Sequence, residues 1–376
     1  MSWDIAAMSA VACLGTNPPE IYRALCAGHT GVAPLRAFDA TKYRVRHAYE
    51  IDDRAEPGRD EPFRATRWLV RVVDDALREA GLSAQAADIP VLVGTTLREL
   101  RSSELWWRDG TSLTPADLHF ARALHERLGV RRTETVASAC AAALYALGMA
   151  TDLIESGVTD TVVVAATDAI TESSFGGLDR VQSPAPQEIR PFDVDRRGMV
   201  MGEGAVAVVL RARGVHTGPV HGVLRGVEMN CDAAHPTVPE PASVARAIRN
   251  AHHRSGIRAA EVDFVIVHGS GTTHNDLAES QALRDVFAET PPGPWITSIK
   301  GGVGHTCGGS GLLSLVTAVQ ALRHGAVPPM HGLHRPMPEA DGLRLVAGAP
   351  ATGPLRIAQI NAIGLGGINA VAMVAA

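Results

Sequence analysis

Several features that would assign a function class directly are scarce or absent in these 376 residues. Aromatic residues make up only 4% of the chain, and every uninterrupted apolar stretch is far shorter than the roughly 18 residues that a membrane-spanning helix needs. No basic segment precedes an apolar core at the N-terminus. We therefore expect neither a membrane span nor a secretory signal.

The charge balance lacks a basic surplus. Lys and Arg total 35 against 40 for Asp and Glu, which gives a net charge of -5, and no block of the chain is rich in Lys or Arg. Nucleic acids and anionic membrane surfaces both attract proteins with excess positive charge. We therefore expect neither as a partner.

Cysteine is sparse and its count is odd. Odd, scattered cysteines argue against a disulfide framework and favour a reducing compartment, so we predict a cytoplasmic protein. We expect at most one or two of the five to have a chemical role. They are Cys13, Cys26, Cys140, Cys231 and Cys307.

Glycine is abundant, with 37 residues, and 46% of the chain is hydrophobic. This length and composition suit a layered α/β enzyme with one large core or two medium ones. Residues 91–96 and 265–269 are short apolar runs that end in glycine and polar residues, as buried parallel strands do.

Each run is followed later in its half by a helix that is small and apolar at its start. The helices run from near Cys140 to Gly157 and from Cys307 to Gly325, and their terminal glycines are 168 residues apart. The pattern indicates an internal duplication with halves at 1–215 and 216–376, although two unrelated buried helices would give the same pattern. Helices without charge in their first turns should lie between sheets, with their N-termini pointing inward.

Three residues in small-residue surroundings are candidates for chemistry. Cys140, in Ser-Ala-Cys-Ala-Ala, begins the first central helix, where the helix dipole would lower the thiol pKa and favour a nucleophilic thiolate. A buried structural cysteine is the alternative. His268 opens His-Gly-Ser-Gly-Thr at a strand end, and His305 closes Gly-Gly-Val-Gly-His before the second central helix.

Other motifs narrow the chemistry. The glycine-rich turn at 361–370 could donate bare N–H groups to an oxyanion, but it opens no helix and so fails as a dinucleotide fingerprint. Neither a phosphate-binding loop with its lysine nor a G-x-S-x-G elbow is present. A zinc set of His268, His274, His305 and Cys307 matches no compact zinc spacing, so we expect no metal.

Taken together, these motifs resemble the β-ketoacyl synthase family of condensing enzymes, which have the thiolase fold. The resemblance runs through nearly the whole chain. The motifs on which it rests are Ser138-Ala139-Cys140, Pro191-Phe192-Asp193 to Arg196, Gly202-Glu203-Gly204, His268 to Thr272, Lys300 with Gly304-His305, and Gly364 to Asn369. It implies duplicated βαβαβ halves in five α-β-α-β-α layers.

The resemblance also implies roles. Cys140 would accept the acyl group, while His268 and His305 would stabilise the enolate formed when a malonyl thioester loses carbon dioxide. Lys300, Asp276 and Glu279 would form a charged network behind the histidines. The N–H groups of Cys140 and Leu365 would form the oxyanion hole. The expected substrate-binding residues are Ser270, Thr272, Leu365, Gly366 and Met199.

The expected activity is acyl loading on Cys140 and condensation with a malonyl unit, in fatty-acid or polyketide biosynthesis. Substrates would arrive on the phosphopantetheine of an acyl carrier protein or on coenzyme A, with no bound cofactor. We expect a homodimer, or a heterodimer with a similar chain, in which the apolar strand at 161–166 pairs with its symmetry mate.

Departures from the family pattern keep two alternatives open. Leu365 replaces a phenylalanine that gates the cysteine, Met199 replaces a common aromatic residue, and His274-Asn275 replaces a turn with Pro or Gly. The segment from Thr96 to Cys140, with its Leu-Trp-Trp at 105–107, is shorter than usual in a region that shapes the acyl pocket and dimer contact. An acyltransferase with a non-malonyl acceptor is therefore one alternative, and a non-catalytic chain-length-factor partner is the other.

Overall fold

The computed structural model describes residues 2–56, 58–110 and 112–376. Eleven strands pair in the order β12-β10-β9-β14-β15-β8-β1-β7-β6-β4-β5. The strands of the first half are β1 (Trp3–Ala12), β4 (Val91–Gly94), β5 (Thr133–Val136), β6 (Thr161–Asp168) and β7 (Gly204–Ala212). Those of the second half are β8 (Gly222–Cys231), β9 (Phe264–Ile266), β10 (Trp295–Thr297), β12 (Arg344–Leu345), β14 (Ile357–Gly364) and β15 (Ile368–Ala375).

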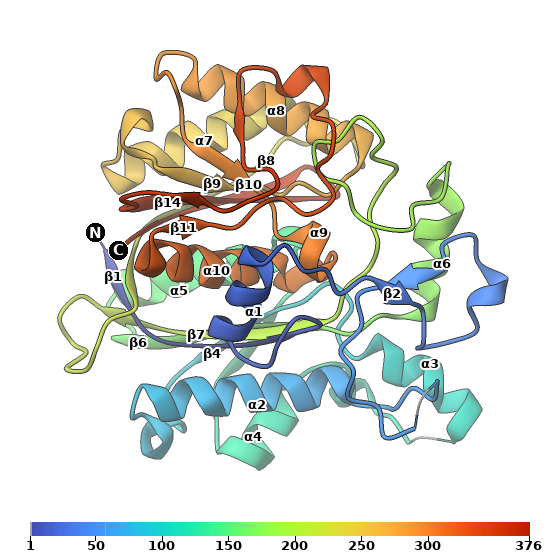
Figure 1. The fold of residues 1–376 in the computed structure, drawn as a ribbon. Helices are drawn as coiled ribbons and strands as arrows, with labels where there is room; N and C mark the ends of the chain where they lie inside the picture. Colours follow the sequence, from blue (N-terminus) through green and yellow to red (C-terminus); the bar gives the residue numbers. More distant parts are fainter. Residues whose placement is uncertain (1, 57, 111) are drawn as a thin grey trace.

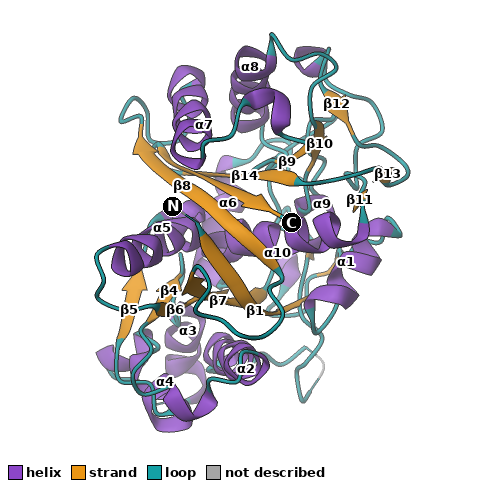
Figure 2. Ribbon diagram, turned by 90° about the vertical axis from the view of Figure 1, so that its left-hand side faces the viewer, coloured by secondary structure: helices purple, strands orange, loops and turns teal. Residues whose placement is uncertain are grey.

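The strands form two stacked sheets with helices between and outside them, so the predicted five layers are confirmed (Figure 1). The middle layer holds α5 (Ala142–Glu155) and α10 (Ser310–His324). The outer layers hold α2 (Arg64–Glu79) with α4 (Ala121–Leu128) below, and α7 (Pro241–Ser255) with α8 (Thr273–Phe287) above. The sheets meet where the start of β1 pairs with β8, and Figure 2 shows these two strands side by side.

The two halves share one strand order. The sequence β5-β4-β6-β7-β1 in the first half matches β10-β9-β14-β15-β8 in the second, and both begin with parallel pairs and end with antiparallel ones. The central helices begin at Ala142 and Ser310, which have the same 168-residue spacing as the terminal glycines. The boundary at residues 215 and 216 lies in the loop between β7 and β8, and remains a prediction.

The middle helices are apolar because both of their faces are covered. α10 is buried from Ser310 to Leu322, and it packs against α5 in the middle layer. A Cβ added at Gly311 would lie 2.6 Å from the Cγ of Leu144, so only glycine permits this approach. This glycine therefore sets how closely the two central helices approach each other within the middle layer.

One prediction about the sheet edge is wrong. The strand at 161–166 cannot pair with a symmetry mate, because β6 already pairs with β7 on one side and β4 on the other. Its apolar character on both faces reflects an internal position within its own sheet. The strand at this end of the sheet is β5, which pairs with β4.

The remaining elements lie around the two sheets. Across the described residues, no helix is both long enough and apolar enough to cross a membrane. These elements are α1 (Pro18–Cys26), α3 (Leu100–Asp109), α6 (Glu172–Val181), α9 (Lys300–Val303), the pair β2 (Ala33–Pro34) and β3 (His47–Ala48), and the pair β11 (Ala326–Val327) and β13 (Ala351–Thr352). Short 3₁₀ turns cover 40–42, 83–85, 115–118, 139–141, 259–261, 307–309 and 338–340.

Candidate active site

The predicted nucleophile lies at the buried start of α5. Cys140 is in the 3₁₀ turn Ala139–Ala141, directly before the helix, and only 9% of its surface is exposed. Ala139 has a φ of 46°, a left-handed conformation that is uncommon for a residue other than glycine. This sharp turn presents the sulfur at the N-terminal end of a central helix.

Both predicted histidines come from neighbouring strands of the other sheet. β9 and β10 are parallel, so their carboxyl ends lie at the same edge, with His268 following β9 and His305 following β10. The two imidazole rings are 5.4 Å apart between centroids and inclined by 80°. The Nε2 of His305 lies 3.1 Å from the Sγ of Cys140. The structure therefore brings the three predicted residues together.

The tautomer of His305 follows from its backbone surroundings. The N–H of Cys307 donates to the Nδ1 of His305 at 3.1 Å, and a backbone N–H can only donate. Nδ1 is therefore unprotonated, and in the neutral ring Nε2 carries the hydrogen. His305 thus offers a hydrogen-bond donor to the sulfur of Cys140, or to an oxygen placed beside it.

The three predicted supporting residues lie close to the histidines, and their direct hydrogen bonds are mainly to backbone groups. Lys300 Nζ donates to the carbonyl oxygen of His268. Glu279 accepts from the N–H groups of His268 and Gly269 at 2.8 and 2.9 Å. Among the described residues, Lys300 forms no ion pair within 4.0 Å of either acid.

Asp276 also binds backbone N–H groups, one of them in the loop that follows His268. It accepts from the N–H groups of Phe192 and Gly271 at 2.9 and 3.2 Å. The two acids therefore shape the loop that carries His268, and their effect on Lys300 acts over a longer distance. Burial raises the pKa of both carboxyls.

Burial dominates the ionisation of the catalytic candidates. It raises the pKa of Cys140 to about 11, although nearby Lys300 and the Leu365 N–H oppose this. The expectation of a lowered thiol pKa is therefore wrong, because desolvation of the thiolate outweighs the helix end. Burial and then Lys300 lower the pKa of His305 to about 3, and the pKa of His268 also falls well below its usual value. Both rings are neutral at pH 7.

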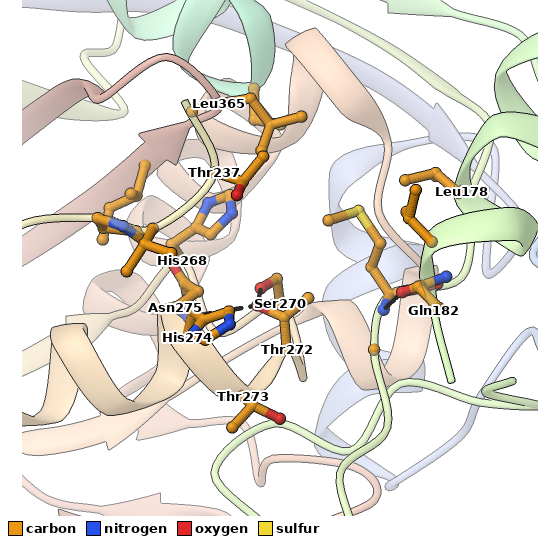
Figure 3. A pocket seen from close by; sticks show the side chains of 18 of the residues that line it. Leu178, Gln182, Thr237, His268, Ser270, Thr272, Thr273, His274, Asn275 and Leu365 are labelled. Carbon is orange, nitrogen blue, oxygen red and sulfur yellow. Dashed lines mark hydrogen bonds between the residues drawn. The ribbon is translucent and has the colours of Figure 1, made fainter. Parts of the chain in front are cut away.

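A pocket of about 540 Å³ opens onto Cys140 and His268. Figure 3 shows Leu178 and Gln182 on one side, facing His268 and Thr237 across the cavity. Of the predicted substrate-binding residues, Ser270, Thr272, Met199 and Leu365 line it. The hydroxyls of Ser270 and Thr272 lie 2.9 Å apart.

The glycine-rich turn closes one wall of this pocket. It joins β14 to β15 and reaches the nucleophile, because a Cβ added at Gly364 would lie 3.3 Å from the backbone nitrogen of Cys140. The N–H of Leu365 is directed at the Cys140 thiol, and the Leu365 side chain is 49% exposed. Gly366 instead donates its N–H to the carbonyl of Pro236 at 2.8 Å.

Two features of the pocket were missed from the sequence. Gln182 holds Met199 through both backbone groups, accepting from its N–H at 2.7 Å and donating to its carbonyl at 3.1 Å. The exposed loop after β8 also lines the mouth, and its Asp232 N–H donates to the Gly367 carbonyl at 2.9 Å. Neither feature has a sequence signal, because Gln182 and Met199 are joined across an irregular loop and Asp232 and Gly367 are 135 residues apart.

The ligand atoms of Cys140, His268 and His305 lie within 4.8 Å of one another, and their types suit zinc. A histidine that binds a metal through Nε2 normally carries its hydrogen on Nδ1 and donates it to an acceptor. The Cys307 N–H points at that Nδ1 instead. The donor arrangement therefore disfavours a metal at His305.

Comparisons with known proteins assign the class. The family models for the β-ketoacyl synthase N-terminal and C-terminal domains match residues 4–214 and 221–334. The chain therefore belongs to the β-ketoacyl synthase family, a family of acyl-transferring condensing enzymes.

Two curated relatives and one solved structure are similar over most of their lengths. The chain is 29% identical to 3-oxoacyl-[acyl-carrier-protein] synthase 2 of Synechocystis sp., covering 97% of this chain and 95% of the relative. It is 30% identical to the tetracenomycin polyketide synthase ketoacyl synthase alpha subunit of Streptomyces glaucescens, covering 87% and 86%. The ishigamide ketosynthase/chain length factor structure matches with a TM-score of 0.89 and 29% identity, covering 100% and 98%.

Proposed function

We propose that this protein loads an acyl group onto Cys140 and condenses it with a malonyl unit, in fatty-acid or polyketide biosynthesis. The observation that carries the proposal is the 3.1 Å separation of the Cys140 Sγ from the His305 Nε2, with His268 beside the His305 ring. Cys140 and His268 line the same pocket. One named relative is a 3-oxoacyl-[acyl-carrier-protein] synthase and the other is a polyketide ketoacyl synthase subunit, which supports the same kind of reaction here.

In the loading step, the Sγ of Cys140 attacks the carbonyl carbon of an acyl thioester. A carbon–sulfur bond forms to Cys140 as the bond to the carrier sulfur breaks, and the thiol proton goes to the departing thiol. The N–H groups of Cys140 and Leu365 would donate to the carbonyl oxygen while it carries negative charge. The side chain at position 365 is not needed for this.

In the condensing step, a malonyl thioester loses carbon dioxide. The electron pair of the broken carbon–carbon bond stays on the thioester and forms an enolate. The enolate oxygen would accept hydrogen bonds from His305 Nε2–H and from the imidazole of His268. The enolate carbon then attacks the acyl carbonyl, a carbon–carbon bond forms, and Cys140 leaves as a thiolate. Neutral rings suit this role, because they donate hydrogen bonds without giving up a proton.

The acyl groups would be carried on phosphopantetheine, either of an acyl carrier protein or of coenzyme A, with Ser270 and Thr272 contacting the arm. Both hydroxyls line the pocket that leads to Cys140, which supports this assignment. We also infer a homodimer, or a heterodimer with a similar chain, formed through the β5 edge. The absence of a bound cofactor and the cytoplasmic location remain predictions.

The acyltransferase alternative rests on Leu365. This side chain lines the pocket beside Cys140 and is half exposed, so the space for a second substrate is wider than a phenylalanine would leave. An alcohol or amine acceptor could then replace the malonyl unit. Cys140 argues against the chain-length-factor alternative, because such partners usually lack the cysteine.

The test is intact-protein mass spectrometry after incubation with a panel of acyl thioesters. Wild type and a Cys231→Ala control should each gain one acyl mass, because Cys231 is the exposed cysteine that would react non-specifically. Cys140→Ala should gain none. A substrate-dependent adduct on Cys140→Ala would overturn the assignment of the nucleophile.

A further inference from the structure

A buried hydroxyl group contacts the ring of His305 at Nδ1, the nitrogen that faces away from Cys140. The Oγ of Ser310 lies 3.0 Å from the Nδ1 of His305 and 3.2 Å from the Oγ1 of Thr306. All three residues are at most 3% exposed. The ring of His305 therefore has a buried chain of hydroxyls on one nitrogen and the Cys140 sulfur on the other.

One fixed donor determines which group donates and which accepts in each of these hydrogen bonds. The Cys307 N–H already donates to Nδ1, so Nδ1 carries no hydrogen and can only accept. Ser310 must then donate its single hydroxyl hydrogen to Nδ1. Because that hydrogen is used, the contact between Ser310 and Thr306 places Thr306 as the donor.

Hydrogen bonds that end on Nδ1 polarise the whole ring. They hold the remaining hydrogen on Nε2 and make the Nε2–H a better donor toward the Cys140 sulfur or an enolate oxygen. We infer that Ser310, supported by Thr306, is a positioning residue that fixes the proton of His305 on Nε2 and strengthens its hydrogen bond in the pocket. This inference rests on the proposed function for its effect on decarboxylation.

The helix itself does not require this serine. Ser310 is the first residue of α10, and no side chain caps the N-terminus of that helix by a hydrogen bond. The equivalent position at the start of α5 in the other half is Ala142, which has no hydroxyl. In this chain the other central helix therefore begins without a serine.

Ser310→Ala and Ser310→Thr test the inference, with Ser314→Ala as the control. Ser314 is one turn further along α10 and is equally buried, so its loss tests the helix without touching His305. Two rates would be measured: alkylation of Cys140 by iodoacetamide across pH, and carbon dioxide release from malonyl coenzyme A or a malonyl carrier protein.

Ser310→Ala should lower the carbon dioxide release rate roughly three- to tenfold, the range that one neutral hydrogen bond covers. Its alkylation profile should also shift to higher pH, because the thiolate loses a strong donor. Ser310→Thr should recover most of both effects, and Ser314→Ala should match wild type. Wild-type behaviour of folded Ser310→Ala, or failure of Ser310→Thr to recover, would overturn the inference.

The same measurements distinguish failure of the proposed function from failure of the Ser310 inference. If wild type releases no carbon dioxide, the condensing reaction is wrong, while the alkylation profile still decides the role of Ser310. If Ser310→Ala does not fold, Thr306→Val replaces it, with Thr306→Ser as its control. The valine variant should show a smaller shift of the alkylation profile in the same direction, and an unchanged profile would overturn the inference.

Discussion

Ala139 and Cys307 occupy equivalent positions of the two halves and share a left-handed backbone, with φ angles of 46° and 47°. Each lies in a 3₁₀ turn before a central helix. The first turn presents the Cys140 sulfur, and the second directs the Cys307 N–H at the His305 ring. The same strained turn therefore serves both halves of the site, once through a side chain and once through the backbone.

His305→Ala should still load an acyl group on Cys140 but should release little carbon dioxide from a malonyl thioester. Loss of one oxyanion donor lowers turnover by about 10²- to 10³-fold. His253→Ala is the control, because His253 is an exposed histidine on α7 that does not line the pocket. If wild type decarboxylates no malonyl donor, the acyltransferase alternative replaces the condensing reaction.

Leu365→Phe should slow loading of the native acyl group more than loading of acetyl. The ring fills space beside Cys140 without changing polarity, and size discrimination of this kind is worth about 1 to 3 kcal/mol. The measurement is the loading rate of a bulky and a small acyl thioester on both proteins. Equal ratios in wild type and variant would mean that this position does not select the substrate.

Lys300→Met should raise the Cys140 pKa further above about 11, because a nearby positive charge favours the thiolate. Iodoacetamide alkylation should slow by roughly tenfold per unit of that rise. Burial lowers the pKa of Lys300 itself to about 8, so its charge, and the difference from wild type, should shrink above that pH.

Lys42→Met is the matched control for that experiment, because Lys42 is the only other lysine in the chain and its side chain is exposed. Its alkylation profile should equal that of wild type. A Lys300→Met profile that also equals wild type, in a folded protein, would show that the charge does not reach the thiol.

Light scattering at micromolar concentration should give the mass of a dimer. Trp107→Ser should weaken that dimer, because Trp107 is 77% exposed on α3 in the segment expected to contact the partner. Val220→Ser, at an exposed apolar residue in the loop between β7 and β8, should leave the dimer unchanged. A monomeric mass for wild type would count decisively against the dimer.

Local sequence patterns predicted several of the elements and most of the residues of the candidate site. Apolar runs ending in glycine gave β4, β9 and the hairpin of β14 and β15, because local patterning decides which segments can be buried. The small residues around Cys140 and the glycines before His305 marked the two central helix starts for the same local reason. These motifs also carried the resemblance to the family.

How these parts contact one another depends on tertiary packing, which local patterns do not predict. The contact of Cys140 with His305 spans 165 residues, and the pKa of the thiol depends on how completely the surrounding layers exclude water. Asp276 and Glu279 bind backbone amides because the loop folds around them. The position of β6 inside the sheet depends on pairing with β4 and β7. Long-range pairing and burial are properties of the packed chain, and local sequence does not encode them.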